Sequence, residues 1–133
     1  MLRPLAALLV LAAAPAPAPW LVGDWFGQGQ PYDRSEMWLA HIKPNGEIQV
    51  QFRTCAKGKA LDKYEGGWWS LSGNTETIRI VTVNGLIYPR TDTYTILTQN
   101  GRKQVYRYQR TGFVYTSSRV DGTFEMPSCE AVS

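Results

Sequence analysis

Apolar and polar residues alternate along much of the chain, with the period of two that is typical of β-strands. The alternation is clearest in residues 36–43 and 47–55, which flank a Pro-Asn-Gly turn at residues 44–46. A three-residue turn there places Trp38 opposite Phe52 and gives the hairpin one wholly apolar face. Because a slip of one residue would mix the two faces, we predict a hairpin in this register.

Glycine-containing turn sequences separate a series of further β-rich segments. The predicted strands are a first one up to Gly27, followed by residues 36–43, 47–55, 67–71, 76–83, 86–98, 103–109 and 113–120. Pro89 interrupts the sixth and predicts a bulge or a sheet edge. Residues 28–35 and 56–66 are polar or charged and are predicted to be loops. The series predicts an all-β, eight-stranded antiparallel up-and-down β-barrel without substantial helix.

The beginning of the chain has the character of an export signal. A short basic start precedes an apolar run, residues 5–14, that is too short to span a bilayer, and an Ala/Pro repeat follows. We therefore expect residues 1–18 to be a signal peptide, with the cleavage point left open, and residues 19–133 to be a single barrel domain. An uncleaved apolar tail is the alternative. Export implies a periplasmic or secreted protein, and no later segment is apolar enough to cross a membrane.

Cys55 and Cys129 are the two cysteines of the chain. In an oxidising compartment an even pair is most simply a disulfide, with two unrelated free thiols as the alternative. The disulfide would close a loop of about 75 residues and contribute up to roughly 4 kcal/mol in the chain-entropy model. Cys55 falls on the polar, outer face of the predicted hairpin, where a C-terminal tail could reach it.

The charge balance argues against a nucleic-acid partner. The formal net charge is +3, and removal of Arg3 with the leader lowers it to about +2. Basic residues within 102–110 surround Tyr106 and Tyr108, but such a segment is better explained as a solvated edge than as a platform for single strands. We expect no cofactor and no metal, and a monomer.

The sequence resembles the lipocalin and calycin group at Gly23-Asp24-Trp25 and at Arg119. The resemblance implies that Gly23, Trp25 and Arg119 form the floor of the barrel, with the guanidinium packed across the indole. It also implies a tail tied to a strand by a disulfide, and a small exported protein of bacterial type. The chain departs from the family in its short length and in having no helix predicted after the last strand.

The many aromatic residues, five Trp, seven Tyr and four Phe, exceed what a core of this size usually needs. A two-residue turn at 111–112 would place Tyr108 opposite Tyr115 and would direct these rings inward with Arg119. The candidate ligand-binding residues are Trp38, Phe52, Tyr106, Tyr108, Phe113 and Tyr115. Two interpretations stay open, a hollow aromatic pocket and a barrel that the same side chains fill.

Other chemistry-bearing residues suggest no reaction. His41 is the only histidine and falls on the outer face, without a nucleophile or a set of metal ligands beside it. One ring of Trp68-Trp69 is predicted on each face of its strand. Nothing in the sequence brings Asp24 and Asp92 together. We therefore expect no catalytic residue and no enzyme.

Two functions fit these observations. The first is a binding protein that holds a small apolar or aromatic molecule inside the barrel. The alternative is a protein-binding module, such as an exported protease or lysozyme inhibitor, that acts through residues 28–35 and 57–65 because rigid loops bind with little ordering cost.

Overall fold

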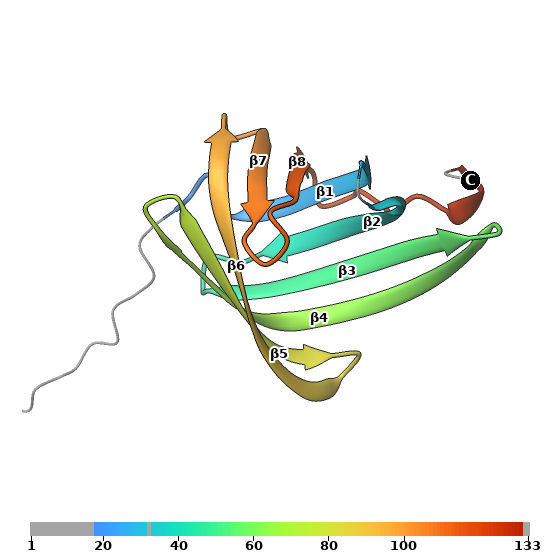
Figure 1. Cartoon of the computed structure of the whole chain (residues 1–133), viewed down its shortest axis with the longest axis horizontal. Helices are drawn as coiled ribbons and strands as arrows, with labels where there is room; N and C mark the ends of the chain where they lie inside the picture. Colours follow the sequence, from blue (N-terminus) through green and yellow to red (C-terminus); the bar gives the residue numbers. More distant parts are fainter. Residues whose placement is uncertain (1–17, 32, 132–133) are drawn as a thin grey trace, which may run out of the picture.

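The computed structural model describes residues 18–31 and 33–131, which form a closed antiparallel β-barrel (Figure 1). The elements are β1 (Gly23–Gln30), β2 (Asp33–Ile42), β3 (Glu47–Ala56), β4 (Lys59–Ser72), β5 (Thr75–Val83), β6 (Leu86–Gln99), β7 (Lys103–Tyr108), β8 (Val114–Val120) and a short 3-10 helix, η1 (Cys129–Ala131). Each strand pairs with the next along the chain, and β1 pairs with β8 to close the barrel. The predicted eight-stranded up-and-down barrel is confirmed.

The β2–β3 hairpin has the predicted register, with Trp38 paired to Phe52. The backbone N–H of Lys43 donates to the Glu47 carbonyl at 2.9 Å and closes the three-residue turn. Gly46 completes this turn with a φ of 97°, a backbone conformation that favours glycine. The separation of apolar and polar positions was therefore sufficient to fix this pairing.

The two segments predicted to be loops, residues 28–35 and 56–66, are largely strand. β1 continues to Gln30, β2 begins at Asp33 and β4 begins at Lys59. Only short turns therefore join β1 to β2 and β3 to β4. The prediction was wrong because polar residues with glycine and proline in the first segment, and a high density of charge in the second, were taken as the mark of a loop. In the structure cross-strand pairing satisfies the charges: Arg53 of β3 and Asp62 of β4 form an ion pair at 2.8 Å.

The β7–β8 pairing also differs from the prediction, by two residues. Tyr106, not Tyr108, lies opposite Tyr115. The turn is longer than two residues, because the N–H of Tyr108 bonds the Phe113 carbonyl at 2.9 Å and the N–H of Gly112 bonds the Tyr108 carbonyl at 2.8 Å. A shift of two keeps each side chain on its predicted face, but it places Phe113 in the turn, outside the strand.

The predicted irregularity near Pro89 is present. The β5–β6 register shifts between Ile80, which faces Arg90, and Thr82, which faces Ile87. Pro89 lies in the extra stretch of β6, where it has no strand partner. The bulge bends the end of this hairpin, which projects below the rest of the barrel in Figure 1.

The N-terminal part of the described chain covers one end of the barrel, which we call the closed end. Leu21 and Trp25 are 0% and 1% exposed, and the Trp25 Nε1–H donates to the Leu21 carbonyl at 2.8 Å. Ala18 is also buried within this core cluster. The predicted signal peptide otherwise occupies residues 1–17, which lie outside the described residues.

Arg119 of β8 packs across Trp25, as the Gly-x-Trp resemblance implies. Its guanidinium carbon lies 4.5 Å from the centre of the indole ring. It donates to the carbonyls of Val22 and Gly101, both at 2.7 Å, and to that of Trp20. The cation–π contact and three carbonyl acceptors together join the chain before β1, the β6–β7 turn and β8 into one floor.

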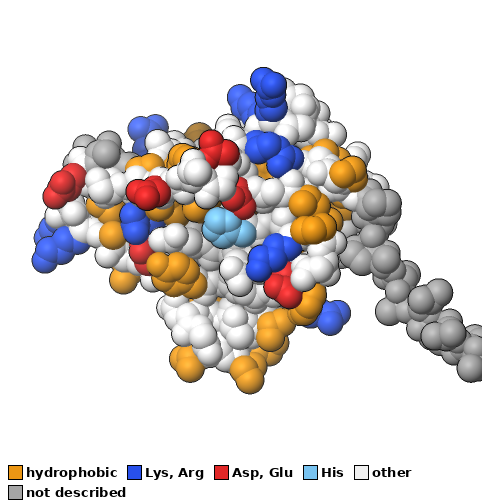
Figure 2. Space-filling view, turned by 180° about the vertical axis from the view of Figure 1, so that it is seen from behind, with side chains coloured by type: hydrophobic (Ala, Val, Ile, Leu, Met, Phe, Trp, Pro, Cys, Tyr) orange, Lys and Arg blue, Asp and Glu red, His pale blue; other side chains and the backbone are white. Residues whose placement is uncertain are grey.

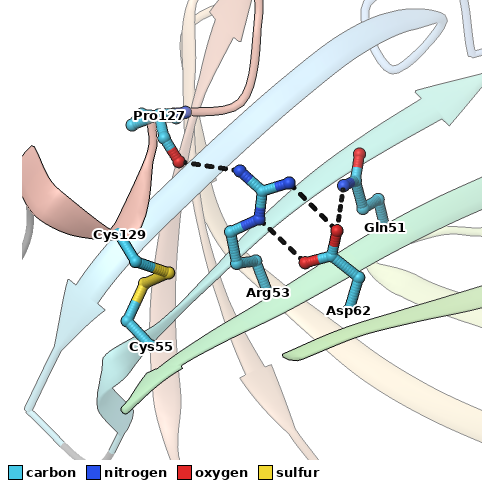
Figure 3. The surroundings of a disulfide bond; sticks show 6 residues. All are labelled: Gln51, Arg53, Cys55, Asp62, Pro127 and Cys129. Carbon is cyan, nitrogen blue, oxygen red and sulfur yellow. Dashed lines mark hydrogen bonds and ion pairs between the residues drawn. A yellow bond between two sulfur atoms is a disulfide. The ribbon is translucent and has the colours of Figure 1, made fainter. Parts of the chain in front are cut away.

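The C-terminal tail returns along the outside of the barrel and is fastened near the opposite, open end (Figures 1 and 3). The Cys55–Cys129 disulfide is present, with the two Cα atoms 5.3 Å apart. Beside it Arg53 bonds Asp62 in a bidentate pair, at 2.8 and 2.9 Å, and donates to the Pro127 carbonyl at 3.0 Å (Figure 3). The hydrogen bonds from Arg53 hold the pKa of Asp62 below its usual value, so this clamp stays charged at neutral pH.

Candidate functional site

The barrel encloses a cavity of about 320 Å³ between the Trp25 floor and the open end. Its size lies at the lower end of the range of about 300–1,000 Å³ that is usual for small-molecule pockets. All eight strands contribute to the wall, with the residues Trp25, Glu36, Trp38, Ala40, Ile42, Ile48, Val50, Phe52, Lys63, Glu65, Glu76, Ile78, Arg90, Asp92, Tyr94, Gln104, Tyr106, Tyr108, Arg110, Tyr115 and Ser117. The barrel is thus hollow, which the sequence had left open.

Aromatic rings form a continuous arc around half of this wall. Tyr94 stacks on Tyr108 with ring centres 5.0 Å apart, and it meets Tyr106 edge to face at 5.6 Å. Tyr106 stacks on Tyr115 at 6.1 Å, and Tyr115 meets Trp38 edge to face at 5.6 Å. Each contact holds the orientation of the next ring, so the arc offers a preformed surface to an apolar or aromatic molecule.

Hydrogen bonds fix the polar edges of the arc. The Trp38 Nε1–H donates to Ser117 Oγ at 3.0 Å, and the Tyr106 hydroxyl shares a hydrogen bond of 3.0 Å with the same oxygen. The Tyr108 hydroxyl donates to Asp92 Oδ1 at 2.8 Å. Burial raises the pKa of Tyr94 and of Tyr106, so both phenols stay neutral.

An ion-pair network crosses the wall nearer the open end. Arg90 of β6 bonds Glu65 of β4 at 2.8 Å and Asp92 at 2.9 Å, and Lys63 lies 3.4 Å from Glu65. Burial disfavours the charge on Arg90, but its hydrogen bonds to Asp92 and Glu65 outweigh burial and raise its pKa. Because Lys63 and Arg110 are largely exposed, this network marks the mouth of the cavity.

Two polar side chains of the wall are buried without a complete set of partners. Glu76 of β5 is 6% exposed and Gln104 of β7 is 4% exposed. Within the described part of the chain, neither Glu76 Oε2 nor Gln104 Oε1 has a hydrogen-bond partner. Burial raises the pKa of Glu76 to about 7. Such atoms are rare in folded proteins and point to a role beyond the stability of the barrel.

Five of the six residues predicted to bind a ligand lie on the cavity wall: Trp38, Phe52, Tyr106, Tyr108 and Tyr115. Phe113 does not, because the longer β7–β8 turn removes it from the strand. The prediction missed the polar half of the wall, above all Glu76, Glu65, Arg90, Asp92 and Gln104. For Glu76 the signal was present, since it alternates with Ile78 and Ile80 and so had to share their inward face.

Four other candidates lie outside the cavity wall: Asp24, His41, Trp68 and Trp69. The His41 Nδ1 lies 2.8 Å from Asp24 Oδ1, and both side chains are partly exposed. The structure does not bring Asp24 and Asp92 together. Asp24 bonds His41, whereas Asp92 belongs to the network at the mouth. Trp69 is 4% exposed and Trp68 is 50% exposed, as predicted for rings on opposite faces.

In residues 18–31 and 33–131, no helix is long and apolar enough to cross a membrane, and no three His, Cys, Asp or Glu side chains are grouped to hold a metal ion. Comparison with protein-family models, curated proteins and solved structures found no match to this chain. The barrel and its cavity are therefore the features of this chain that point to a function.

Proposed function

We propose that this chain is an exported, lipocalin-like binding protein that holds a small apolar or aromatic molecule inside the barrel. The observation that carries the proposal is the cavity of about 320 Å³ with its preformed aromatic arc, closed by a floor at one end and opening at the other. The chain acts as a monomeric carrier or scavenger, and not as an enzyme.

Two further observations support the location and the class. The Cys55–Cys129 disulfide is typical of proteins that fold in an oxidising compartment, and the leader-like start of the sequence agrees with export. The Arg119–Trp25 floor at a Gly-x-Trp sequence agrees with the lipocalin resemblance.

The proposal is tested by identifying a bound ligand and then by filling the cavity with a larger side chain. Native mass spectrometry of protein purified from its own host should show a bound small molecule, and neutral aromatic compounds should change the tryptophan fluorescence on titration. Val50→Phe adds a ring inside the cavity and should abolish the titration, whereas Gln49→Phe adds the same ring to the exposed outer face and should leave it unchanged. No bound species and no response in the unaltered protein would refute the proposal.

A second candidate function is favoured by exposed apolar side chains at the open end. Leu61 of β4 and Leu86, Ile87 and Tyr88 of β6 are 74%, 73%, 83% and 58% exposed. Figure 2 shows hydrophobic side chains on the projecting end of the β5–β6 hairpin, at the bottom of that view. Exposed patches of this kind often mark protein-binding surfaces, in this case for a secreted enzyme such as a protease or lysozyme.

The second function is tested by inhibition and binding assays with secreted proteases and lysozymes. The double variant Leu86→Ser/Ile87→Ser should lose binding if the hairpin end is the contact, while Val50→Phe should retain it. Binding that survives the double variant would exclude this surface.

A further inference from the structure

Glu76 and Gln104 occupy the deep half of the cavity, close to the floor. Glu76 pairs across the sheet with Tyr94, whereas Arg90 of the mouth network pairs with Ile80, four residues farther along β5 towards the open end. Gln104 pairs with Ser117, whose hydroxyl anchors the aromatic arc. Both side chains therefore face the space beneath the aromatic rings.

No cation of the described chain neutralises Glu76, because none of the ion pairs among the described residues includes this carboxylate. The basic residues of the cavity wall, Lys63, Arg90 and Arg110, all lie at the mouth beside Glu65 or Asp92. Arg119, below the floor, is committed to three backbone carbonyls. A carboxyl group buried without a cation is a strong constraint on what the cavity can hold.

Two phenols lie within range of the charge on Glu76. Burial, and to a smaller extent this charge, raises the pKa of Tyr94 of β6 and of Tyr106 of β7, so both phenols stay neutral. On the other neighbouring strand, β4, the residue opposite Glu76 is Leu71. The surroundings thus supply aromatic faces and apolar groups around one acid and one amide.

We propose that the cavity takes a small organic cation, a protonated amine on an aromatic or alkyl body, whose ammonium group binds Glu76 and Gln104 beneath the aromatic arc. This inference rests on the proposed ligand-binding function and names the class of ligand. An ammonium group carries several donors and no acceptor, which matches two acceptor oxygens that lack partners. Its charge compensates the carboxylate and is favoured by aromatic rings.

Other polar groups fit this site less well. A hydroxyl group brings a single donor and leaves one of the two acceptors without a partner. A carboxylate would place a second negative charge beside Glu76 and brings no donor. An amine can therefore donate to both acceptor oxygens, whereas an alcohol of the same shape can donate to only one of them.

Amine binding should depend on pH through Glu76. Burial raises the pKa of Glu76 to about 7 in the empty cavity, and the ammonium binds the ionised form. Below this pKa the carboxyl must first lose its proton, so affinity should fall about tenfold for each unit of pH. Above pH 7 the affinity should level off, because an alkylamine, like lysine with a pKa of about 10.4, stays protonated to higher pH.

The test compares 2-phenylethylamine with 2-phenylethanol, which share a body and differ in the ammonium and hydroxyl groups. Isothermal titration calorimetry at pH 5, 6, 7 and 8 should show amine affinity that rises with pH and exceeds that of the alcohol at pH 8 at least tenfold. Glu76→Gln should remove both the preference and the pH slope, and Gln104→Met should weaken amine binding. Glu125→Gln, which alters an exposed carboxylate on the C-terminal tail and outside the cavity wall, should change neither. Circular dichroism confirms that each variant is folded.

The remaining outcomes separate this inference from the broader function. Equal, pH-independent binding of amine and alcohol would overturn the inference and leave a binding protein for apolar molecules. Amine binding that persists unchanged in Glu76→Gln would also overturn it. If neither probe binds and neutral aromatic compounds also fail to bind, the ligand-binding function itself is wrong.

Discussion

Gly27 leaves the space that the indole of Trp38 occupies. A Cβ atom at this position would lie 2.2 Å from Trp38 Cζ2 and 2.8 Å from the Thr116 carbonyl oxygen, closer than any real contact. The aromatic arc thus depends on a residue that has no side chain. The Gly-x-Trp pattern drew attention to Gly23, but the sequence alone did not distinguish Gly27 from an ordinary turn glycine.

Gly27→Ala should therefore destabilise the protein by about 1–3 kcal/mol, the usual range for overpacking. Urea unfolding measures the change. Gly122→Ala is the matched control, because a Cβ there has no heavy atom within 4 Å, and it should be close to neutral. Equal stability of the two variants would contradict the packing described for Trp38.

Trp25→Ala should cost about 3–5 kcal/mol, because it removes a fully buried indole and leaves Arg119 without its aromatic partner. Thermal unfolding of the variant measures the loss. Trp68→Ala, on the exposed face of β4, is the control and should change stability far less. Near-normal stability of Trp25→Ala would mean that the floor does not depend on this ring.

Glu76 should make the unliganded protein less stable as the pH rises. Its pKa is 4.5 in the unfolded chain and about 7 in the barrel. Between these values the unfolded state loses its proton first, so the free energy of unfolding falls, by at most about 3 kcal/mol, and is constant above pH 7. Urea unfolding at pH 5 and pH 8 should show this loss, Glu76→Gln should remove it and Glu125→Gln, in the tail, should retain it.

At the scale of elements, predictions succeeded where a strand has one apolar face. The β2–β3 hairpin was assigned to its exact partners because an error of one residue would have exposed Trp38 or Phe52. The start of β4 was missed because its inward positions are Lys63 and Glu65, whose partners are brought together only by the closed barrel. The β7–β8 turn was predicted two residues too short, since either length keeps the same faces.

The C-terminal tail contributes stability although its regular structure is limited to the short helix η1. Reduction of Cys55–Cys129 should lower the free energy of unfolding by about 2–4 kcal/mol, because the loop it closes is long. The measurement is thermal unfolding with and without dithiothreitol. The double variant Cys55→Ser/Cys129→Ser should be insensitive to the reductant. If reduction has no effect on the unaltered protein, the Arg53 clamp alone holds the tail.

For the whole molecule, the sequence predicted the closed barrel but not its empty interior. Strand number follows from turns and alternation along the chain, whereas cavity volume depends on how side chains from all eight strands meet across the barrel axis. Aromatic positions such as Tyr106 could be assigned to the wall from their alternation. The lack of any cation partner for Glu76 among the described residues could not be predicted, because it is a property of the assembled wall.

The seam between β1 and β8 has the fewest paired residues in the barrel. Three residue pairs connect β1 to β8, from Asp24–Val120 to Phe26–Ser118. Five pairs connect β6 to β7 and β7 to β8, and ten connect β3 to β4. Towards the open end, β1 and β8 therefore separate first when the barrel fluctuates. Backbone amides of Gly27–Gln30 and of the first half of β8 should exchange with deuterium sooner than those of β3. A bound molecule that contacts both β1 and β8 should slow this exchange. The exchange rate of these amides should therefore report whether the cavity is occupied.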